Sequence, residues 1–209
     1  MRVARAWSLV VALFLAVGGA TAQSPVVEAG YPSKPVRLLV PFGPGGVSDI
    51  VGRVLAQKMG ELLGQTIVVE NRPGAGGMIG AASIAKSAPD GYSLVLSSLS
   101  PYAIGPRLVK SPPYDPVADF TPIGGVAYFP FILAVNASLP VKSAQDLVTY
   151  AQQNKGRVFY AYGTPTVQIP AEAINRIEKL DATGVPYKSS PDAMVDVIGG
   201  RAQFLVVDL

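Results

Sequence analysis

The chain has 209 residues, of which 49% are hydrophobic and 15% charged, so it has enough apolar residues for one or two domains of ordinary size. Its 17 basic and 14 acidic residues are scattered and form no basic run, which disfavours nucleic-acid binding. Histidine and cysteine are absent, which excludes histidine-based nucleophile arrangements, His-rich zinc sites and disulfides.

The first stretch, residues 1–22, has the pattern of a secretory leader. Arg2 and Arg5 give it a positive start, and Leu9–Val17 is an apolar core shorter than the about 20 residues that a membrane-spanning helix needs. Ala20-Thr21-Ala22 is a small-residue cleavage site. We predict export to the periplasm, which leaves 15 basic residues against 14 acidic ones. The alternative is a membrane anchor or a buried helix.

A glycine-rich turn follows the first predicted strand. The apolar run Val36–Val40 predicts a buried strand, and apolar residues at helical spacing predict a helix over Ile50–Leu63. The turn between them contains Phe42, Gly43, Pro44, Gly45 and Gly46. Without Cβ atoms, the last two residues of the turn let a ligand approach the backbone amides closely.

The start of this first helix favours an anion. Ser48 or Asp49 is expected to cap the helix, and Asp49 to hold the loop in shape. The remaining free amides and the positive end of the helix dipole attract negative charge. The alternative is a tight strand-to-helix turn that binds nothing.

A second unit repeats this plan. Thr66–Glu70 predicts a short strand, and the loop Asn71–Gly77 opens a helical pattern over Met78–Ala88. Tyr92–Ser98 predicts a third strand that ends on Ser97 and Ser98. In a parallel sheet these segments meet at one carboxyl edge, where open α/β sheets bind ligands. Neither glycine loop matches a P-loop or a dinucleotide motif.

Arg72 precedes the second glycine loop and has two interpretations. Its guanidinium can clamp a carboxylate with two parallel hydrogen bonds. Alternatively, it pairs with a neighbouring acid and orients the loop, which we favour.

From Ser111 the chain is rich in proline, which predicts a stiff crossing segment between two domains. We expect one α/β lobe over residues 23–110 and a second over residues 111–209. Gly124–Asn136 predicts one or two strands broken at Pro130.

The rest of the chain alternates strands and helices. Ser143 and Asp146 have the spacing of a capping box. Ser190 is expected to cap a helix whose first residue is Pro191. Ile174 and Ile177 are expected to face inward. Further helices are predicted over Leu147–Asn154 and Ala171–Leu180, and strands over Arg157–Tyr162, Gly184–Lys188 and Ala202–Val207.

Five runs also resemble a known family. They are YPSKPVRLLVPFGPGGVSDIVGR, VVENRPGAGGMIG, APDGYSLVLSS, YDPVADFTPIGGVA and VPYKSSPDAMVDVIGGRAQF. In this order they are similar to the Bug-type solute-binding proteins of tripartite tricarboxylate transporters. The resemblance implies a two-lobed α/β periplasmic-binding-protein fold with mostly parallel sheets. It implies a monomeric receptor, not an enzyme and without cofactor or metal, that binds a small carboxylate and delivers it to a membrane permease.

The two glycine loops predict where such a ligand binds. The expected donors are the amides of Gly45, Gly46, Gly76 and Gly77, with Ser97 nearby. The complete set of expected contacts is Phe42, Gly43, Pro44, Gly45, Gly46, Asp49, Gly76, Gly77, Ser97, Ser98, Tyr162, Gly163, Thr164 and Asp208. The segment after Gly163 is a few residues shorter than in the family, where a longer glycine- and serine-rich loop precedes the helix.

Two other functions stay open. Relatives continue beyond Leu209, so we expect a C-terminally truncated receptor with an incomplete first lobe, poor stability and weak or no binding. The first alternative is therefore that the chain is a receptor fragment without function. The second possibility is an enzyme on an anionic substrate with Asp49 or Asp208 as general base, although the sequence places no second titratable group beside either residue.

Overall fold

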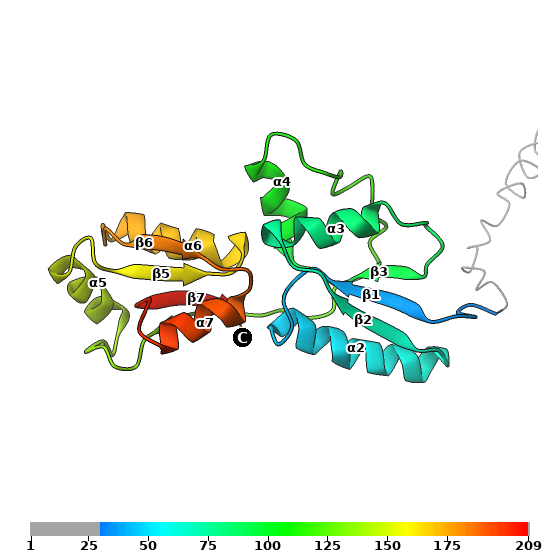
Figure 1. Cartoon of the computed structure of the whole chain (residues 1–209), viewed down its shortest axis with the longest axis horizontal. Coiled ribbons are helices and arrows are strands. Elements are labelled where there is room, and N and C mark those ends of the chain that lie inside the picture. The colour runs from blue at the N-terminus through cyan, green and yellow to red at the C-terminus, as the bar shows by residue number, and fades with distance from the viewer. Residues whose placement is uncertain (1–29, 209) are drawn as a thin grey trace, which may run out of the picture. The chain divides into compact units, whose positions relative to one another are not determined.

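The computed structural model describes residues 30–208, so the predicted leader lies outside the described residues. The described chain forms a three-stranded sheet of order β2-β1-β3 and a four-stranded sheet of order β4-β7-β5-β6 (Figure 1). Neighbouring strands are parallel, except for the antiparallel pair β4 and β7. The predicted α/β class with mostly parallel sheets is confirmed.

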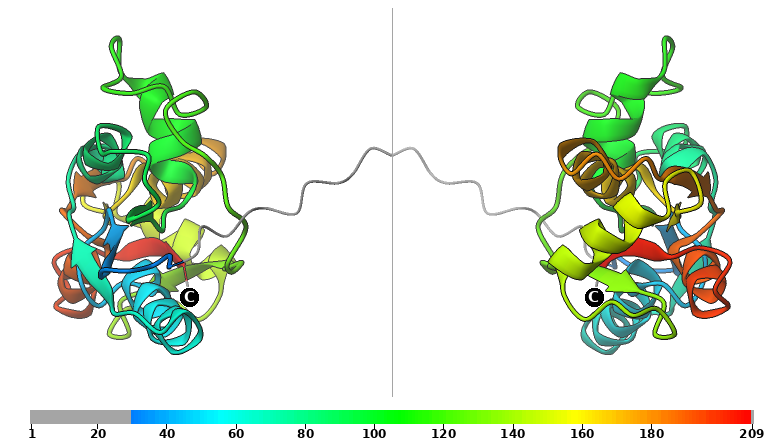
Figure 2. Two further views of the ribbon diagram at one scale, coloured as in Figure 1. Left: turned by 90° about the vertical axis from the view of Figure 1, so that its right-hand side faces the viewer. Right: turned by 90° about the vertical axis from the view of Figure 1, so that its left-hand side faces the viewer.

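The first sheet and its two helices, α2 and α3, are called the first lobe. Val36 and Leu38 of β1 pack with Ala56 of α2, whereas the adjacent residue Leu39 faces the other side of the sheet, because side chains alternate along a strand. Figures 1 and 2 show α2 and α3 on opposite faces of this sheet. Its elements are β1 (Val36–Val40), α2 (Val47–Leu63), β2 (Ile67–Asn71), the short 3₁₀ turn η1 (Ala75–Gly77), α3 (Met78–Ala85) and β3 (Ser93–Val95).

The strands and helices predicted for this lobe form, with some differences at their ends. Helix α2 begins at Val47 with Gly46 in the N-cap position, so the predicted caps Ser48 and Asp49 lie inside the helix. At the other end of α2, Gly64 is the C-cap residue and adopts the left-handed conformation with φ 67°, which glycine tolerates best. Strand β3 is shorter than predicted and does not reach Ser97.

The crossing segment first packs on the first lobe. After a helical stretch, η2 (Ser100–Ile104) and α4 (Gly105–Leu108), Tyr114 and Phe120 pack against α3. The Tyr114 hydroxyl donates to the Pro101 carbonyl at 2.5 Å. We propose that the boundary between the lobes lies between Phe120 and the start of β4.

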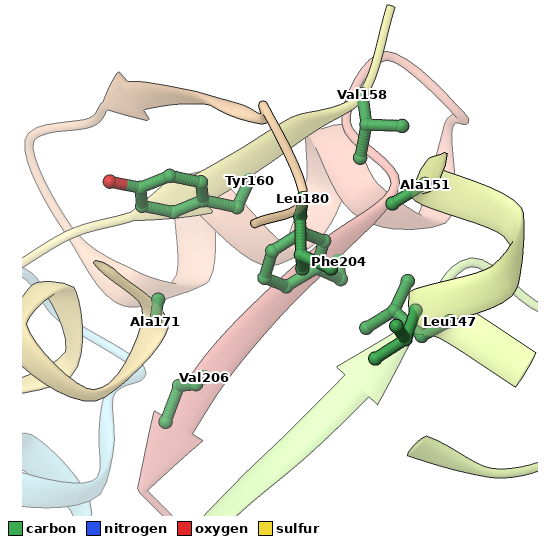
Figure 3. Packing of buried hydrophobic residues seen from close by; sticks show 9 residues of the cluster. Leu147, Ala151, Val158, Tyr160, Ala171, Leu180, Phe204 and Val206 are labelled. Carbon is green, nitrogen blue, oxygen red and sulfur yellow. The ribbon is translucent and has the colours of Figure 1, made fainter. Parts of the chain in front are cut away.

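The second sheet and helices α5, α6 and α7 are called the second lobe. Tyr160 of β5 and Phe204 of β7 stack with ring centroids 5.5 Å apart, on the face that α5 and α6 cover (Figure 3). The opposite face, with Ala161 and Leu205, packs against α7. The elements are β4 (Phe131–Val135), α5 (Ala144–Gln153), β5 (Phe159–Tyr162), α6 (Pro165–Ile177), β6 (Thr183–Pro186), α7 (Ser190–Ile198) and β7 (Phe204–Asp208).

Three local predictions for this lobe are wrong. Helix α6 begins at Pro165 and not at the predicted Ala171, so residues 165–170 are helical too. Proline suits the first turn because its φ is already helical and because the N–H that it lacks would have no intrahelical partner there. Ile177 is 74% exposed, since the buried face of α6 is formed by residues earlier in the helix. Helix α7 is capped by Ser189, one residue before the predicted Ser190.

The predicted cap of α5 is confirmed. The Ser143 hydroxyl accepts a hydrogen bond from the backbone N–H of Asp146 at 3.1 Å. Between Phe120 and Phe131 the chain forms no helix or strand and is mostly exposed, so the predicted strands near Pro130 reduce to β4 alone.

Candidate ligand-binding site

A cavity of about 250 Å³ lies where the two lobes meet. Because β1 runs parallel to both β2 and β3, the loops that follow these strands meet at one edge of the first sheet. The parallel pair β5 and β6 likewise brings the residues after each strand to one edge of the second sheet. The cavity is lined by Pro41, Phe42, Gly74, Ala75, Gly76, Gly77, Gly163, Pro186, Tyr187 and Lys188.

The loop 74–77 has an unusual backbone. Gly74, Ala75, Gly76 and Gly77 all have positive φ angles of 132°, 48°, 65° and 95°. Glycine adopts such angles without steric cost, whereas alanine rarely does. The Gly77 amide donates to the Gly74 carbonyl at 2.9 Å, while the Gly76 amide has no backbone partner among the described residues. The Gly76 amide is therefore one of the unpaired donors of this loop, together with the amides of Gly74 and Ala75.

Glycines allow the two lobes to approach each other closely. A Cβ atom on Gly76 would lie 2.7 Å from Cδ of Pro165, at the start of α6. A Cβ atom on Gly43 would lie 2.8 Å from Cβ of Ser189, the N-cap of α7. The loops that begin α2 and α3 thus lie against the residues that begin α7 and α6, so four helix N-termini meet where the lobes touch, next to the cavity.

Asp49 holds the loop between β1 and α2. Its carboxylate is 4% exposed and accepts a hydrogen bond from the Gly45 amide at 2.9 Å. It also accepts from Nδ2 of Asn71 at 2.9 Å and forms an ion pair with Arg53 at 3.0 Å. Asn71 additionally donates to the Phe42 carbonyl at 3.2 Å, so the end of β2 is tied to this loop. The Gly45 amide is engaged by this carboxylate and is not free for a ligand, contrary to expectation.

The environment of Asp49 opposes a role as general base. Burial alone raises its pKa, but hydrogen bonds from Arg53, the Gly45 amide and Asn71, with the positive charge of Arg53, lower the pKa below its ordinary value. A general base at neutral pH works best with a pKa near 7. Asp49 also does not line the cavity. Its contacts fit a structural role in shaping the loop.

The predicted ligand contacts divide into two groups. Phe42, Gly76, Gly77 and Gly163 line the cavity. The others lie beside it or further along the same sheet edges, namely Gly43, Pro44, Gly45, Gly46, Asp49, Ser97, Ser98, Tyr162, Thr164 and Asp208. The sequence-based prediction missed Tyr187 and Lys188, although they are the last two residues of the predicted strand Gly184–Lys188, whose end could have indicated the same sheet edge.

Arg72 is exposed and does not line the cavity. The nearby acid Glu70 pairs with Arg37, with Nε of Arg37 2.6 Å from the carboxylate. The hydrogen bond from Arg37 and the positive charges of both arginines lower the pKa of Glu70. Glu70 therefore has Arg37, and not Arg72, as its ion-pair partner. Arg72 forms no ion pair among residues 30–208, so its predicted pairing with a neighbouring acid is not observed.

Residues 30–208 contain no helix long and apolar enough to cross a membrane. Within the same range, no cluster of three or more acidic side chains could hold a metal ion.

Comparison with known proteins identifies the family. The profile of a family described as "Tripartite tricarboxylate transporter family receptor" matches residues 51–209. The chain belongs to this family. It is 40% identical over 197 residues to the protein BugT of Bordetella pertussis, an alignment that covers 91% of the chain and 59% of BugT. The family is described as one of receptors, in agreement with the expectation that the chain is not an enzyme.

Solved structures of receptors share the fold. A Rhodopseudomonas palustris protein described with adipate is 34% identical, with a TM-score of 0.83 over 86% of the chain and 60% of that protein. MatC from Rhodopseudomonas palustris, described with bound malate, is 29% identical, with a TM-score of 0.78 over 85% of the chain and 61% of MatC. The chain thus spans about three fifths of the length of the relatives that it matches.

Proposed function

We propose that this tripartite tricarboxylate transporter receptor chain binds a small carboxylate in the cavity between its two lobes. The convergence of four helix N-termini carries the proposal. A helix N-terminus carries about half a positive charge and amides without an intrahelical partner, which attract anions. The Gly45 and Asp192 amides are already engaged by side chains, which leaves the remaining amides for a ligand. Helices α2 and α3 come from the first lobe and α6 and α7 from the second.

The shape of the cavity supports a small ligand. Its volume of about 250 Å³ lies just below the range of about 300–1,000 Å³ that is usual for drug-sized ligands. The open Gly76 amide is a candidate donor to the carboxylate. A hydrogen bond to a charged group contributes about 1.5–3 kcal/mol, so a few converging amides could support micromolar binding, which requires about −8.2 kcal/mol.

The relatives support the same ligand class. Two receptors with similar structures are described with adipate and with malate, both of which are small dicarboxylates. By the same analogy, we propose export to the periplasm and delivery of the ligand to membrane permease subunits of the transporter.

Titration calorimetry with a panel of mono-, di- and tricarboxylates and their neutral amides tests this function. We expect saturable one-to-one binding of at least one carboxylate and no binding of its fully amidated form. A folded chain that binds no member of the panel would contradict the proposal and favour a receptor fragment without function.

A further inference from the structure

Lys188 is the one charged residue among those that line the cavity. The other lining residues are glycines, apolar residues and Tyr187. The Tyr187 hydroxyl donates to the Asp196 carboxylate, which is also held by Arg201 at 2.8 Å. That hydroxyl is therefore committed within the second lobe, and the cavity wall offers no other ionisable side chain to a ligand.

The Lys188 ammonium lacks a counter-charge. Lys188 is exposed, and it forms no hydrogen bond or ion pair with the part of the chain that the structure describes. By contrast, Lys58 pairs with Glu61 at 2.7 Å and Lys34 with Asp90 at 3.7 Å. No acidic residue lines the cavity. A positive charge thus stands at the wall of an uncharged cavity, directly before the N-cap of α7.

We infer that Lys188 is a specificity-determining residue that pairs with a second carboxylate of the ligand, so that the chain prefers dicarboxylates. This inference rests on the proposed function, in which helix N-termini bind the first carboxylate. Lysine suits the task because its ammonium is a compact charge on a flexible four-carbon stem, which can follow ligands of different length. A ligand that fills the cavity shields this charge pair from solvent, which makes the pair stronger than one on an open surface.

A pair of matched ligands tests the inference. The straight-chain dicarboxylates from malonate to adipate are screened by calorimetry, and the tightest binder is then compared with its own monoamide, which has the same size and one charge fewer. Each ligand is titrated into the wild-type chain and into the variants Lys188→Gln, Lys188→Arg and Lys155→Gln. Lys155 is an exposed lysine of the same lobe outside the cavity, so its variant controls for net charge.

We expect the wild-type chain to prefer the diacid over the monoamide by about tenfold or more, as one charged hydrogen bond implies. Lys188→Gln should abolish this preference by weakening diacid binding alone, while Lys188→Arg and Lys155→Gln should retain it. Circular dichroism melts establish that each variant is folded.

Two results with the Lys188→Gln variant would overturn the inference. One is equal weakening of diacid and monoamide in Lys188→Gln, which would make Lys188 a general source of positive potential. The other is an unchanged preference in that variant. If the wild-type chain binds neither ligand, both the inference and the proposed function fail. If it binds both ligands with equal affinity, the role of Lys188 is refuted but the proposed function stands.

Discussion

The Asp49 carboxylate binds groups from three segments, namely the loop before α2, the helix itself and the end of β2. We expect Asp49→Asn to lower the free energy of unfolding by about 1–3 kcal/mol, because the amide leaves a buried donor facing other donors. Arg53→Gln should cost less than about 1 kcal/mol, because Arg53 is 57% exposed and its ion pair is screened by solvent. Urea denaturation measures both. A larger loss in Arg53→Gln would contradict this assignment.

The same carboxylate predicts a pH dependence. Its pKa is lower in the folded chain than its ordinary value of 3.8, so its stabilising contribution is present above that value and is lost as the pH falls through the folded pKa. The difference in unfolding free energy between wild type and Asp49→Asn should be full at pH 7 and shrink below pH 3.8. Denaturation curves at pH 7, 5 and 3 measure it, and a difference that grows on acidification would refute the prediction.

For single residues, the sequence predicts a local role better than it predicts contacts with residues far away in the chain. Adjacency in the chain suggested that Asp49 shapes its loop, and its contact with Gly45 agrees. Two features were missed, the contact of Asn71 with Asp49 and the place of Lys188 at the cavity, because they depend on which strands pair and in which register. Such pairing joins residues far apart in sequence and cannot be seen in local patterns.

Among the elements, the turn η1 lies against the start of α6, where a Cβ atom on Gly76 would meet Pro165. Gly76 and Gly45 have similar φ angles of 65° and 77°, but a Cβ atom on Gly45 would meet nothing within 4 Å. Gly76→Ala and Gly45→Ala should therefore incur a similar backbone cost of about 1–2 kcal/mol. Only Gly76→Ala should also push the lobes apart at Pro165 and weaken carboxylate binding, by about tenfold or more if one charged hydrogen bond is lost.

Calorimetry with the best carboxylate, together with urea denaturation of both variants, separates the two effects. Equal losses of binding in the two variants would show that loop strain, and not the approach of the lobes, controls affinity.

Elements with a clear hydrophobic period were predicted well. The strands β1, β2 and β5 are short and rich in apolar residues, and α2 has a regular apolar spacing. The start of α6 was missed, because Pro165 and Pro170 suggest a loop when read locally, although the first turn of a helix accommodates proline. The stretch before β4 is apolar enough for a strand but pairs with no described strand.

In the molecule as a whole, ligand binding should protect backbone amides that belong to both lobes. We expect hydrogen exchange to slow on addition of a saturating carboxylate in residues 74–77 and in the first turns of α6 and α7, because the ligand links these segments. Helix α5, which contributes no residue to the cavity, is the internal control. Protection confined to one lobe would contradict a site between the lobes.

Phe131, the first residue of β4, is paired with Asp208, the last residue of β7. The segment from Phe131 to Asp208 thus begins and ends at one residue pair of its sheet. All residues of the two hydrophobic clusters on that sheet belong to this segment. The segment therefore has adjacent ends and a hydrophobic core of its own. Residues 131–208 should consequently open and close as one cooperative unit under denaturant, independently of the strands β1 to β3, which precede them on the chain.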